Sequence, residues 1–348
     1  MSDILYERVT DGMLGEMREF CRVNWGGEHP LINNREVFDF YYRDGDDIKI
    51  VAAYKPEEEI PVDFLRHDTT RVKPMEFFGV CGFIKTNSDS DPDVYISYIL
   101  SKKGAPFGLS FSMIRRIIEI TNARTVSCNN IRKKTRGIYD FMEYAVRDMT
   151  QWYRLNENID SYTLCDVPFF NIFPTKSRDI PVTEISSDSE LLEFSFSNYK
   201  ENRPHKDFSY VKKRYFGYPF HSYRVFCLSD AGKEALLVLR EIECKGARML
   251  RVVDFIGERS LIKESGAFLD RFMKQRGAEF VDWYAYGELD EAMEHAGFSV
   301  RYPDDSNIIP MYYTPFLLSN VDITIFVSST DGYMMFRADG DQDRPNLG

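Results

Sequence analysis

Apolar and polar positions alternate along this chain in short blocks that predict strands and amphipathic helices. In the first half, β-branched and aromatic residues gather in short segments bounded by turn residues, which is typical of strands. Strands are therefore expected at 4–9, 48–54, 77–84, 94–100, 125–127 and 149–155. Apolar residues at three- and four-residue spacing predict helices at 13–23, 35–42 and 111–121. Asn33 or Asn34 is the expected N-cap of the second of these helices.

The second half repeats this order of elements. Strands are expected at 182–185, 223–228, 235–242, 249–256, 280–286 and 323–327. Helices are expected at 189–197, 208–216, 265–276 and 289–296, and Gly297 is a good C-cap for the last. A proline-rich stretch, 168–181, is the expected join. The repeated order predicts a mixed α/β fold with two domains, residues 1–175 and 176–348.

The segment from Val94 to Tyr144 contains the pattern with the clearest functional meaning. A strand leads into a small-residue loop, Lys102–Ser110, which opens directly into a helix. A second strand follows, then Asn129 and Asn130, then a helix that carries Tyr139. Backbone N–H groups of such a loop and the N-terminus of its helix can receive a pyrophosphate. This is the order of elements that a coenzyme A site needs.

Composition narrows the class of protein. The chain has 348 residues, 43% of them hydrophobic, and a formal net charge of −11. It contains no apolar run of the roughly 18–20 residues that a membrane span requires, and its start has no secretory pattern. Six isolated cysteines and five histidines without ligand spacing predict a cytoplasmic protein without a structural metal. The acidic balance disfavours nucleic acid as a partner.

The loop and the element order resemble those of the GCN5-related N-acetyltransferase (GNAT) superfamily, arranged in tandem. The pyrophosphate loop of that family reads Arg/Gln-x-x-Gly-x-Gly/Ala. The nearest match here is Ala105–Ser110, in which Gly108 and Ser110 fit and Ala105 departs from the pattern. The resemblance implies two tandem GNAT-like domains, each with a mixed, mostly antiparallel central sheet flanked by helices.

A second family motif places an asparagine after the fifth strand and then a helix that ends Tyr-x-x-x-Gly-Phe. Asn129 or Asn130 fills the first position and Tyr139 the second, while Glu143 and Tyr144 replace the Gly-Phe pair. In the second half the closing pair is present as Gly297-Phe298, but the tyrosine position holds Met293. The loop 257–263 of that half has one glycine and bulky side chains, which would keep the backbone away from a pyrophosphate. The resemblance therefore implies that the first domain binds the coenzyme and that the second, degenerate in coenzyme binding, shapes the acceptor site.

The activity implied by the resemblance is acyl transfer from acetyl-CoA or another acyl-CoA to an amine or hydroxyl. A backbone N–H near Ile99 or Leu100 would polarise the thioester carbonyl. Tyr139 would protonate the leaving thiolate, and its alternative role is an aromatic packed at the core edge. The expected coenzyme-binding residues are Ile99, Leu100, Gly104, Phe107, Gly108, Leu109, Ser110, Asn129 and Asn130.

Glu28 and His29 are the candidates for the general base that deprotonates the acceptor. They lie in a loop between the first two helices, which in this fold covers the acceptor pocket. The alternative for His29 is a role in stabilising that loop. The polar ending Phe336–Asn346 predicts either a frayed terminus or a docked segment that addresses a polar acceptor.

The region from Trp25 to Tyr42 and this ending resemble GNAT-type proteins of bacterial polysaccharide biosynthesis. That resemblance alone implies an amino sugar or sugar nucleotide as the small-molecule acceptor. Two alternatives stay open: a catalytically inactive GNAT-fold binding or scaffold protein, and a Fem-type aminoacyl-tRNA-dependent peptidyl transferase. The Fem-type alternative predicts a basic groove and a coiled-coil insertion, neither of which the sequence indicates.

Overall fold

The computed structural model describes residues 4–60, 71–169, 172–302 and 306–344. The chain forms two compact units. The first takes in Met1–Ile84 and Ser90–Val126, and the second takes in Lys85–Asp89 and Ser127–Asn346. These bounds differ from the division at residue 175 that the repeated element order predicts, and the strand pairing described below gives the reason.

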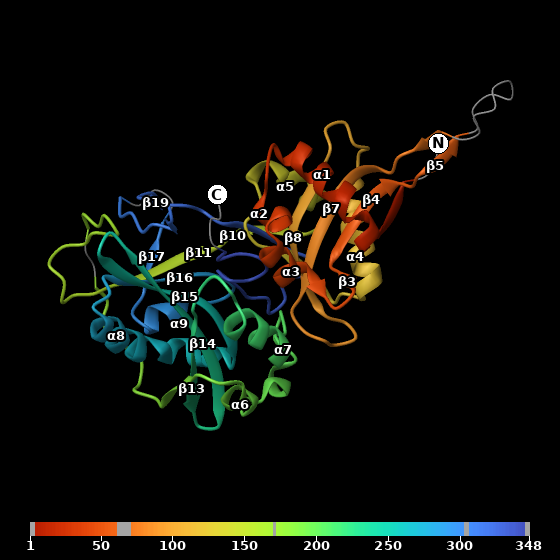
Figure 1. Ribbon diagram of the computed structural model, residues 1–348. Helices are drawn as coiled ribbons and strands as arrows, with labels where there is room; N and C mark the ends of the chain where they lie inside the picture. Colours follow the sequence, from red (N-terminus) through yellow and green to blue (C-terminus); the bar gives the residue numbers. More distant parts are fainter. Residues whose placement is uncertain (1–3, 61–70, 170–171, 303–305, 345–348) are drawn as a thin grey trace, which may run out of the picture. The chain divides into compact units, whose positions relative to one another are not determined.

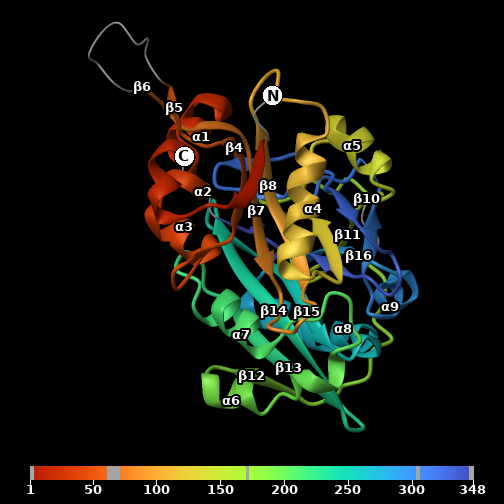
Figure 2. The ribbon, with the colours of Figure 1, turned by 90° about the vertical axis from the view of Figure 1, so that its right-hand side faces the viewer.

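The first unit is built on a mixed sheet. Its elements are β1 (Leu5–Arg8), η1 (Asp11–Met13), α1 (Leu14–Trp25), α2 (Pro30–Asn33), α3 (Arg35–Tyr42), β2 (Arg43–Asp44), β3 (Asp47–Ile48), β4 (Ile50–Lys55), β5 (Glu58–Ile60), β6 (Arg71–Lys73), β7 (Glu76–Lys85), β8 (Asp93–Ser101), α4 (Leu109–Thr121) and the start of β9 (Thr125–Cys128). The main strands lie in the order β1-β4-β7-β8-β9. Figure 2 shows α4 lying along β7 and β8. The predicted cap of α3 is confirmed, since Asn34 Oδ1 accepts the Val37 N–H at 3.1 Å.

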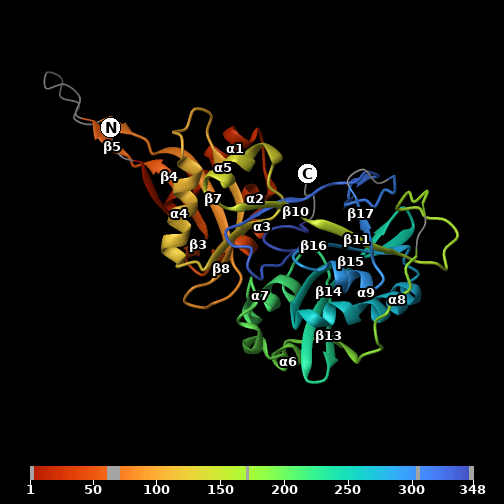
Figure 3. The same ribbon diagram turned by 180° about the vertical axis from the view of Figure 1, so that it is seen from behind.

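The second unit contains an eight-stranded sheet with short helices. Its elements are η2 (Lys133–Thr135), α5 (Arg136–Phe141), β10 (Ala145–Asp148), β11 (Thr150–Leu155), β12 (Val182–Ile185), α6 (Asp188–Leu192), η3 (Phe196–Tyr199), α7 (Phe208–Val211), η4 (Lys212–Phe216), β13 (Arg224–Asp230), β14 (Lys233–Cys244), β15 (Ala247–Gly257), η5 (Arg259–Glu264), α8 (Ser265–Arg276), β16 (Phe280–Tyr286), α9 (Asp290–His295), β17 (Ser299–Arg301), β18 (Tyr312–Tyr313), β19 (Phe316–Leu317), β20 (Thr324–Val327) and β21 (Met335–Phe336). Figures 1 and 3 show α8 and α9 beside strands β14 to β16.

Strands β15 and β16 run parallel but stay paired over a short stretch only. Their register joins Leu250–Val252 with Val281–Trp283. Beyond it, the register between β14 and β15 shifts at Val238/Leu239, which leaves Val253 as an extra residue on β15. The end of β16 pairs instead with β21. The C-terminal segment therefore supplies a short strand where β15 and β16 part.

Each of the two large sheets receives a strand from the other half of the sequence. β11, which precedes the proline-rich join, lies between β16 and β17 and pairs antiparallel with both. β20, near the end of the chain, pairs antiparallel with β10 and with the end of β9. The resulting strand orders, β1-β4-β7-β8-β9-β20-β10 and β12-β13-β14-β15-β16-β11-β17, correspond position by position. A cut at residue 175 would separate both exchanged strands from their partners.

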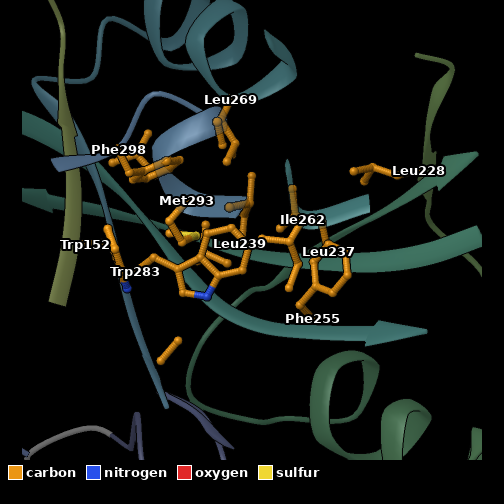
Figure 4. Packing of buried hydrophobic residues seen from close by; sticks show 14 of the residues in the cluster. Trp152, Leu228, Leu237, Leu239, Phe255, Ile262, Leu269, Trp283, Met293 and Phe298 are labelled. Atoms are coloured by element: carbon orange, nitrogen blue, oxygen red, sulfur yellow. The ribbon is translucent and has the colours of Figure 1, made fainter. Parts of the chain in front are cut away.

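The two faces of the second sheet differ in chemistry. One face carries Leu239, Val252 and Trp283, which pack with Leu269 of α8 and Met293 of α9 into the largest buried cluster described here. Figure 4 shows Trp283 near the centre of this cluster. Complete burial of side chains of this size contributes roughly 1.5–3 kcal/mol each. This core holds the exchanged β11 in place through Trp152.

The opposite face is apolar at one end and charged in its middle. Ile242, Met249 and Phe280 form part of a small apolar cluster. Arg251 follows on the same face, paired in register with Arg240 and with Asp282. Side chains of registered neighbours share a face of a sheet. A band of charge thus crosses three adjacent strands, and the C-terminal segment covers it.

The C-terminal segment Tyr333–Asp343 is docked rather than frayed. Every residue in it is buried, although five of its eleven residues are charged or carry an amide. Its backbone contacts include Ala338 N–H to the Val253 carbonyl at 3.0 Å and Met334 N–H to the Arg203 carbonyl at 2.8 Å. The ending is therefore docked, as one of the two alternatives predicted, while its role in addressing a polar acceptor stays a prediction. Within the described ranges, no helix combines the length and the apolar character needed to cross a membrane.

Candidate functional site

The predicted coenzyme loop forms a tight turn between β8 and α4. Gly104 and Gly108 adopt left-handed backbone conformations, with φ of 80° and 83°. Leu109 N–H donates to the Pro106 carbonyl at 3.3 Å, which closes the last turn of the loop. Phe107 is 97% exposed, so this large apolar ring lies on the surface beside the loop. Glycine is the residue that adopts these conformations without strain, so the sequence dictates the turn.

Close packing fixes the start of α4 against the sheet. Leu109 is buried, and a Cβ placed on Gly79 of β7 would lie only 2.7 Å from its Cδ2. The missing side chain at Gly79 therefore allows the first turn of α4 to approach. The Ser110 hydroxyl lies 3.4 Å from the Ser101 hydroxyl at the end of β8. Loop, helix start and strand end are thus one rigid corner.

The N-terminus of α4 is open. No side chain of the described residues caps it, and a Cβ placed on Gly108 would meet no atom within 4 Å. The first turn of a helix carries N–H groups without intrahelical partners and a partial positive charge. Lys103 is exposed in the loop, whereas Lys102 is held by Glu76 at 2.6 Å. The corner can accept an anionic group through backbone N–H groups, as pyrophosphate sites do.

The corresponding corner of the second unit is closed. Glu258 follows β15, and its carboxylate accepts the Ser260 N–H at 3.1 Å at the start of η5. A Cβ on Gly257 would lie 2.7 Å from the Glu234 carbonyl oxygen. Arg259 donates to the carbonyls of Gly332 and Arg203. A carboxylate already occupies the place where an anion would bind, which favours the first unit for the coenzyme.

Ile99 and Leu100 lie at the end of β8, as predicted. Ile99 is half-buried and Leu100 is buried. The strand runs directly into the loop, so a group bound at the α4 N-terminus would extend toward this strand end. The proposed polarising role of their backbone N–H groups stays a prediction.

His29 and Glu28 lie in the turn between α1 and α2. His29 caps α2, since its Nδ1 accepts the Leu31 N–H at 3.3 Å. Its ring stacks on Trp25 at 3.9 Å, and Trp25 contacts Tyr98 of β8 at 5.2 Å between ring centroids. The turn thus reaches the strand residue before Ile99. Glu28 is exposed.

The cap determines the state of the His29 ring. A neutral imidazole that accepts at Nδ1 carries its proton on Nε2. The geometry supports the loop-stabilising role of His29. Its role as a general base stays a prediction.

Tyr139 lies on α5 in the second unit and packs on the exchanged strand. Its side chain is buried, with 6% exposure, and its ring stacks on Phe326 of β20 at 4.2 Å. Tyr144 also lies beside Phe326, at 5.6 Å. The packing alternative for Tyr139 therefore has a defined structural partner. Its role as the acid for the thiolate stays a prediction.

Asn129 and Asn130 bind the C-terminal segment. Asn129 Nδ2 donates to the Phe336 carbonyl at 3.1 Å, and Asn130 Nδ2 contacts Gln342 Oε1 at 3.4 Å. Nearby, the Ser127 and Tyr333 hydroxyls lie 2.7 Å apart. These residues therefore hold the end of the chain in place. The prediction that they bind coenzyme stays untested by these contacts.

Sequence reasoning missed a buried ionic network on the charged face of the second sheet. Lys206 Nζ lies 2.5 Å from Asp254 Oδ1 and 2.6 Å from Asp339 Oδ1. Tyr215 donates to Asp254 Oδ2 at 2.5 Å. Burial raises the pKa of Asp339 to about 6, against the opposing pull of Lys206. The members come from three distant parts of the chain, residues 206–215, Asp254 and Asp339, so no local pattern could indicate the network.

Comparison with solved structures supports the fold. A GCN5-related N-acetyltransferase from Anabaena variabilis ATCC 29413 is similar at a TM-score of 0.50 and 9% identity, over 93% of this chain and 72% of that one. A probable N-acyltransferase from Enterococcus faecalis V583 is similar at a TM-score of 0.51 and 10% identity, over 95% and 74%. No family model and no curated protein matches the sequence. The chain thus has a mixed α/β fold like that of GNAT proteins.

Proposed function

We propose that this protein is an acyl-CoA-dependent acyltransferase of two tandem GNAT-like domains, with the coenzyme bound by the first. The acyl donor is acetyl-CoA or another acyl-CoA. The acceptor is an amine or hydroxyl of a small polar molecule such as an amino sugar or sugar nucleotide. The fold likeness to an N-acetyltransferase and a probable N-acyltransferase supports the reaction class.

One observation carries the coenzyme assignment: the uncapped N-terminus of α4 directly follows a left-handed glycine at the end of a rigid loop. An incoming pyrophosphate would receive backbone N–H groups there without displacing a side chain. The matching corner of the second unit lacks this opening because Glu258 occupies it. Anion binding at that corner would bring two like charges together, which is unfavourable.

The tandem assignment is supported by the strand orders of the two sheets. In both sheets the sixth position is filled by a strand from the other half of the sequence: β20 lies between β9 and β10, and β11 lies between β16 and β17. Both halves also end a short helix in the same way, α5 at Glu143 and α9 at Gly297. In this proposal the second domain shapes the acceptor site.

Within this proposal, the strand end at Ile99 and Leu100 holds the thioester carbonyl, Tyr139 returns a proton to the thiolate, and His29 or Glu28 removes a proton from the acceptor. The reaction forms an amide or ester bond to the acceptor and breaks the thioester carbon–sulfur bond. To act as the base, His29 must give up its cap on Leu31, because Nδ1 now accepts that N–H and a tautomer that frees Nε2 would carry its proton on Nδ1.

The deciding experiment is calorimetric titration of acetyl-CoA into the full-length protein, followed by a turnover assay that detects free thiol with amino-sugar acceptors. Binding with turnover supports the proposal. The absence of any acyl-CoA binding would overturn it.

A coenzyme-binding module without catalysis is the second candidate. It is favoured by the structural roles of Tyr139, stacked on Phe326, and of His29, which caps α2. This candidate predicts binding of acetyl-CoA in calorimetry with no release of thiol for any acceptor. The two measurements together therefore separate the candidates.

A further inference from the structure

The charged face of the second sheet pairs nearly all of its buried cations. Arg251 is held by Asp282 at 2.5 Å, and Arg240 is held by Asp343 at 2.8 Å. Arg301 lies 3.0 Å from Asp322. Buried ions need such partners because removing a charge from water is costly.

Arg214 follows the same rule without a carboxylate. Its guanidinium donates to the Ala338 carbonyl at 3.3 Å and to the Gln342 carbonyl at 2.6 Å. It also lies over the Tyr218 ring at 4.6 Å. The C-terminal segment thus satisfies a cation of the domain with its own backbone.

Arg337, in the same segment, is different. It is 6% exposed, and its Nε and Nη1 are buried without a hydrogen-bond partner among the described residues. Burial lowers the pKa of Arg337, and the neighbouring Arg251 lowers it further. A guanidinium offers five N–H donors and stays charged in proteins. Deprotonation therefore does not remove the unsatisfied donors of Arg337.

The carboxylate that attracts Arg337 already has other partners. Asp343 attracts Arg337 electrostatically, but its carboxylate accepts from Arg240 at 2.8 Å and from the Tyr223 hydroxyl at 3.0 Å. Arg240 and Arg337 together hold the pKa of Asp343 well below its usual range, despite burial. Asp343 therefore remains an anion shared between cations, and it leaves the Arg337 donors unsatisfied.

Two tyrosines lie near Arg337, and one of them is partly exposed. The Tyr312 and Tyr284 phenols are electrostatic neighbours of Arg337, and Tyr312 is 40% exposed. Tyr284 donates to the Val321 carbonyl at 3.1 Å and is thereby fixed.

We propose that Arg337 binds the carboxylate or phosphate group of a small ligand on the charged face of the second sheet. An oxyanion would accept from the unsatisfied guanidinium donors and balance the positive charge of Arg337. This geometry suits arginine, which recognises planar and tetrahedral oxyanions through several N–H groups. The identification of this ligand as the acyl acceptor, which would then carry an acidic group, rests on the proposed function. The oxyanion site itself does not depend on that function.

The test is thermal unfolding of the full-length protein in sodium acetate, in inorganic phosphate and in sodium chloride at matched ionic strength, without acyl-CoA. The wild-type Tm should rise and saturate with acetate or phosphate relative to chloride. Arg337→Gln should weaken this apparent affinity roughly 10- to 100-fold, the worth of hydrogen bonds to a charged group. Arg344→Gln, which removes a half-buried cation paired with Asp341, is the matched control and should keep the response.

The outcomes separate the ligand classes. Saturation by acetate alone identifies a carboxylate, and saturation by phosphate alone identifies a phosphate. No saturable rise over chloride, or an equal loss in both variants, overturns the proposal. In chloride, Arg337→Gln should be at least as stable as wild type, because it removes an unpaired buried charge.

A crystal structure of the wild-type protein grown in phosphate or acetate tests the same site without a substitution. Density for an oxyanion at Nε or Nη1 of Arg337 supports the proposal, and ordered water alone at both atoms overturns it. Neither experiment involves acyl-CoA, so failure here leaves the calorimetric test of the coenzyme site unaffected.

Discussion

Glu143, after α5, holds the same left-handed conformation that Gly297 holds after α9. The φ angles are 60° and 81°. In both places the next residue, Tyr144 or Phe298, donates its N–H to a carbonyl five residues back at 3.0 Å. The left-handed residue itself donates three residues back, at 3.1 and 3.0 Å. These are two Schellman ends, and in one of them a glutamate occupies the glycine position.

Replacing Glu143 by glycine should therefore stabilise the protein. A non-glycine residue in this conformation costs roughly 1 kcal/mol or more, and Glu143 is exposed. We expect Glu143→Gly to raise the free energy of unfolding by up to about 1 kcal/mol in urea titration. Gly297→Ala is the opposite control, because its Cβ would lie 2.5 Å from Arg154 Nη1. Unchanged or lowered stability in Glu143→Gly would contradict the strain argument.

Gly108 should be critical for coenzyme affinity. Leucine at this position would place a side chain in the opening at the α4 N-terminus, where a pyrophosphate would meet backbone N–H groups. The loss of each charge-assisted hydrogen bond should cost about 1.5–3 kcal/mol of binding free energy. Calorimetry with acetyl-CoA should show the Kd rise accordingly.

Gly232→Leu provides the matched control for this change. Gly232 has φ 79°, and a Cβ there meets no atom within 4 Å, as at Gly108. Both variants thus suffer the same backbone strain, but Gly232 lies in the β13–β14 turn. Gly257 is unsuitable as a control because its Cβ would collide with the Glu234 carbonyl. An equal loss of affinity in both leucine variants would refute the loop assignment.

His221 should make stability depend on pH. Burial, helped by Arg240, lowers the pKa of His221 to about 4, and its Nε2 is buried without a partner in the described part of the chain. Between this value and its usual 6.5, the unfolded chain binds more protons than the folded protein. Stability should therefore fall as the pH drops from about 6.5 to about 4. Urea titrations across this window should show that the free energy of unfolding falls less steeply in His221→Gln than in wild type. His295→Gln is the control and should follow wild type.

Local patterns predicted the elements well but not their partners. The bounds of α8 and β16 match the predicted 265–276 and 280–286, because periodicity and flanking turn residues are local properties. The strand expected at 149–155 forms as β11 (Thr150–Leu155), but β10 (Ala145–Asp148) just before it was not predicted. Met149 separates the two strands, and its N–H donates to the Ile323 carbonyl at 2.8 Å. Such a split arises from pairing with a distant strand. The local sequences of β11 and β20 do not indicate that each strand pairs with the sheet of the other half of the chain.

The candidate site likewise has a part that local sequence predicts and a part that depends on long-range contacts. The loop from Gly104 to Ser110 follows from adjacent residues, and the structure forms it as predicted. Asn129 and Asn130 instead contact residues more than 200 positions away, which no spacing rule connects to them. The polar composition of the C-terminal segment left a frayed end and a docked segment equally open, and in the structure its charges are buried in pairs such as Asp343 with Arg240. Buried ion pairs look like surface residues in a sequence.

Tyr139 is the sharpest test of the proposed chemistry. If it protonates the thiolate, Tyr139→Phe should lower kcat about 10²–10⁴-fold with little change in coenzyme affinity. Phenylalanine keeps the ring that stacks on Phe326 at 4.2 Å, so the Tm should hold and the kinetic loss can be assigned to the hydroxyl. Tyr144→Phe, beside the same ring at 5.6 Å, is the control and should keep its turnover. Undiminished kcat in Tyr139→Phe would leave Tyr139 with a packing role only, and the acid would have to be sought elsewhere.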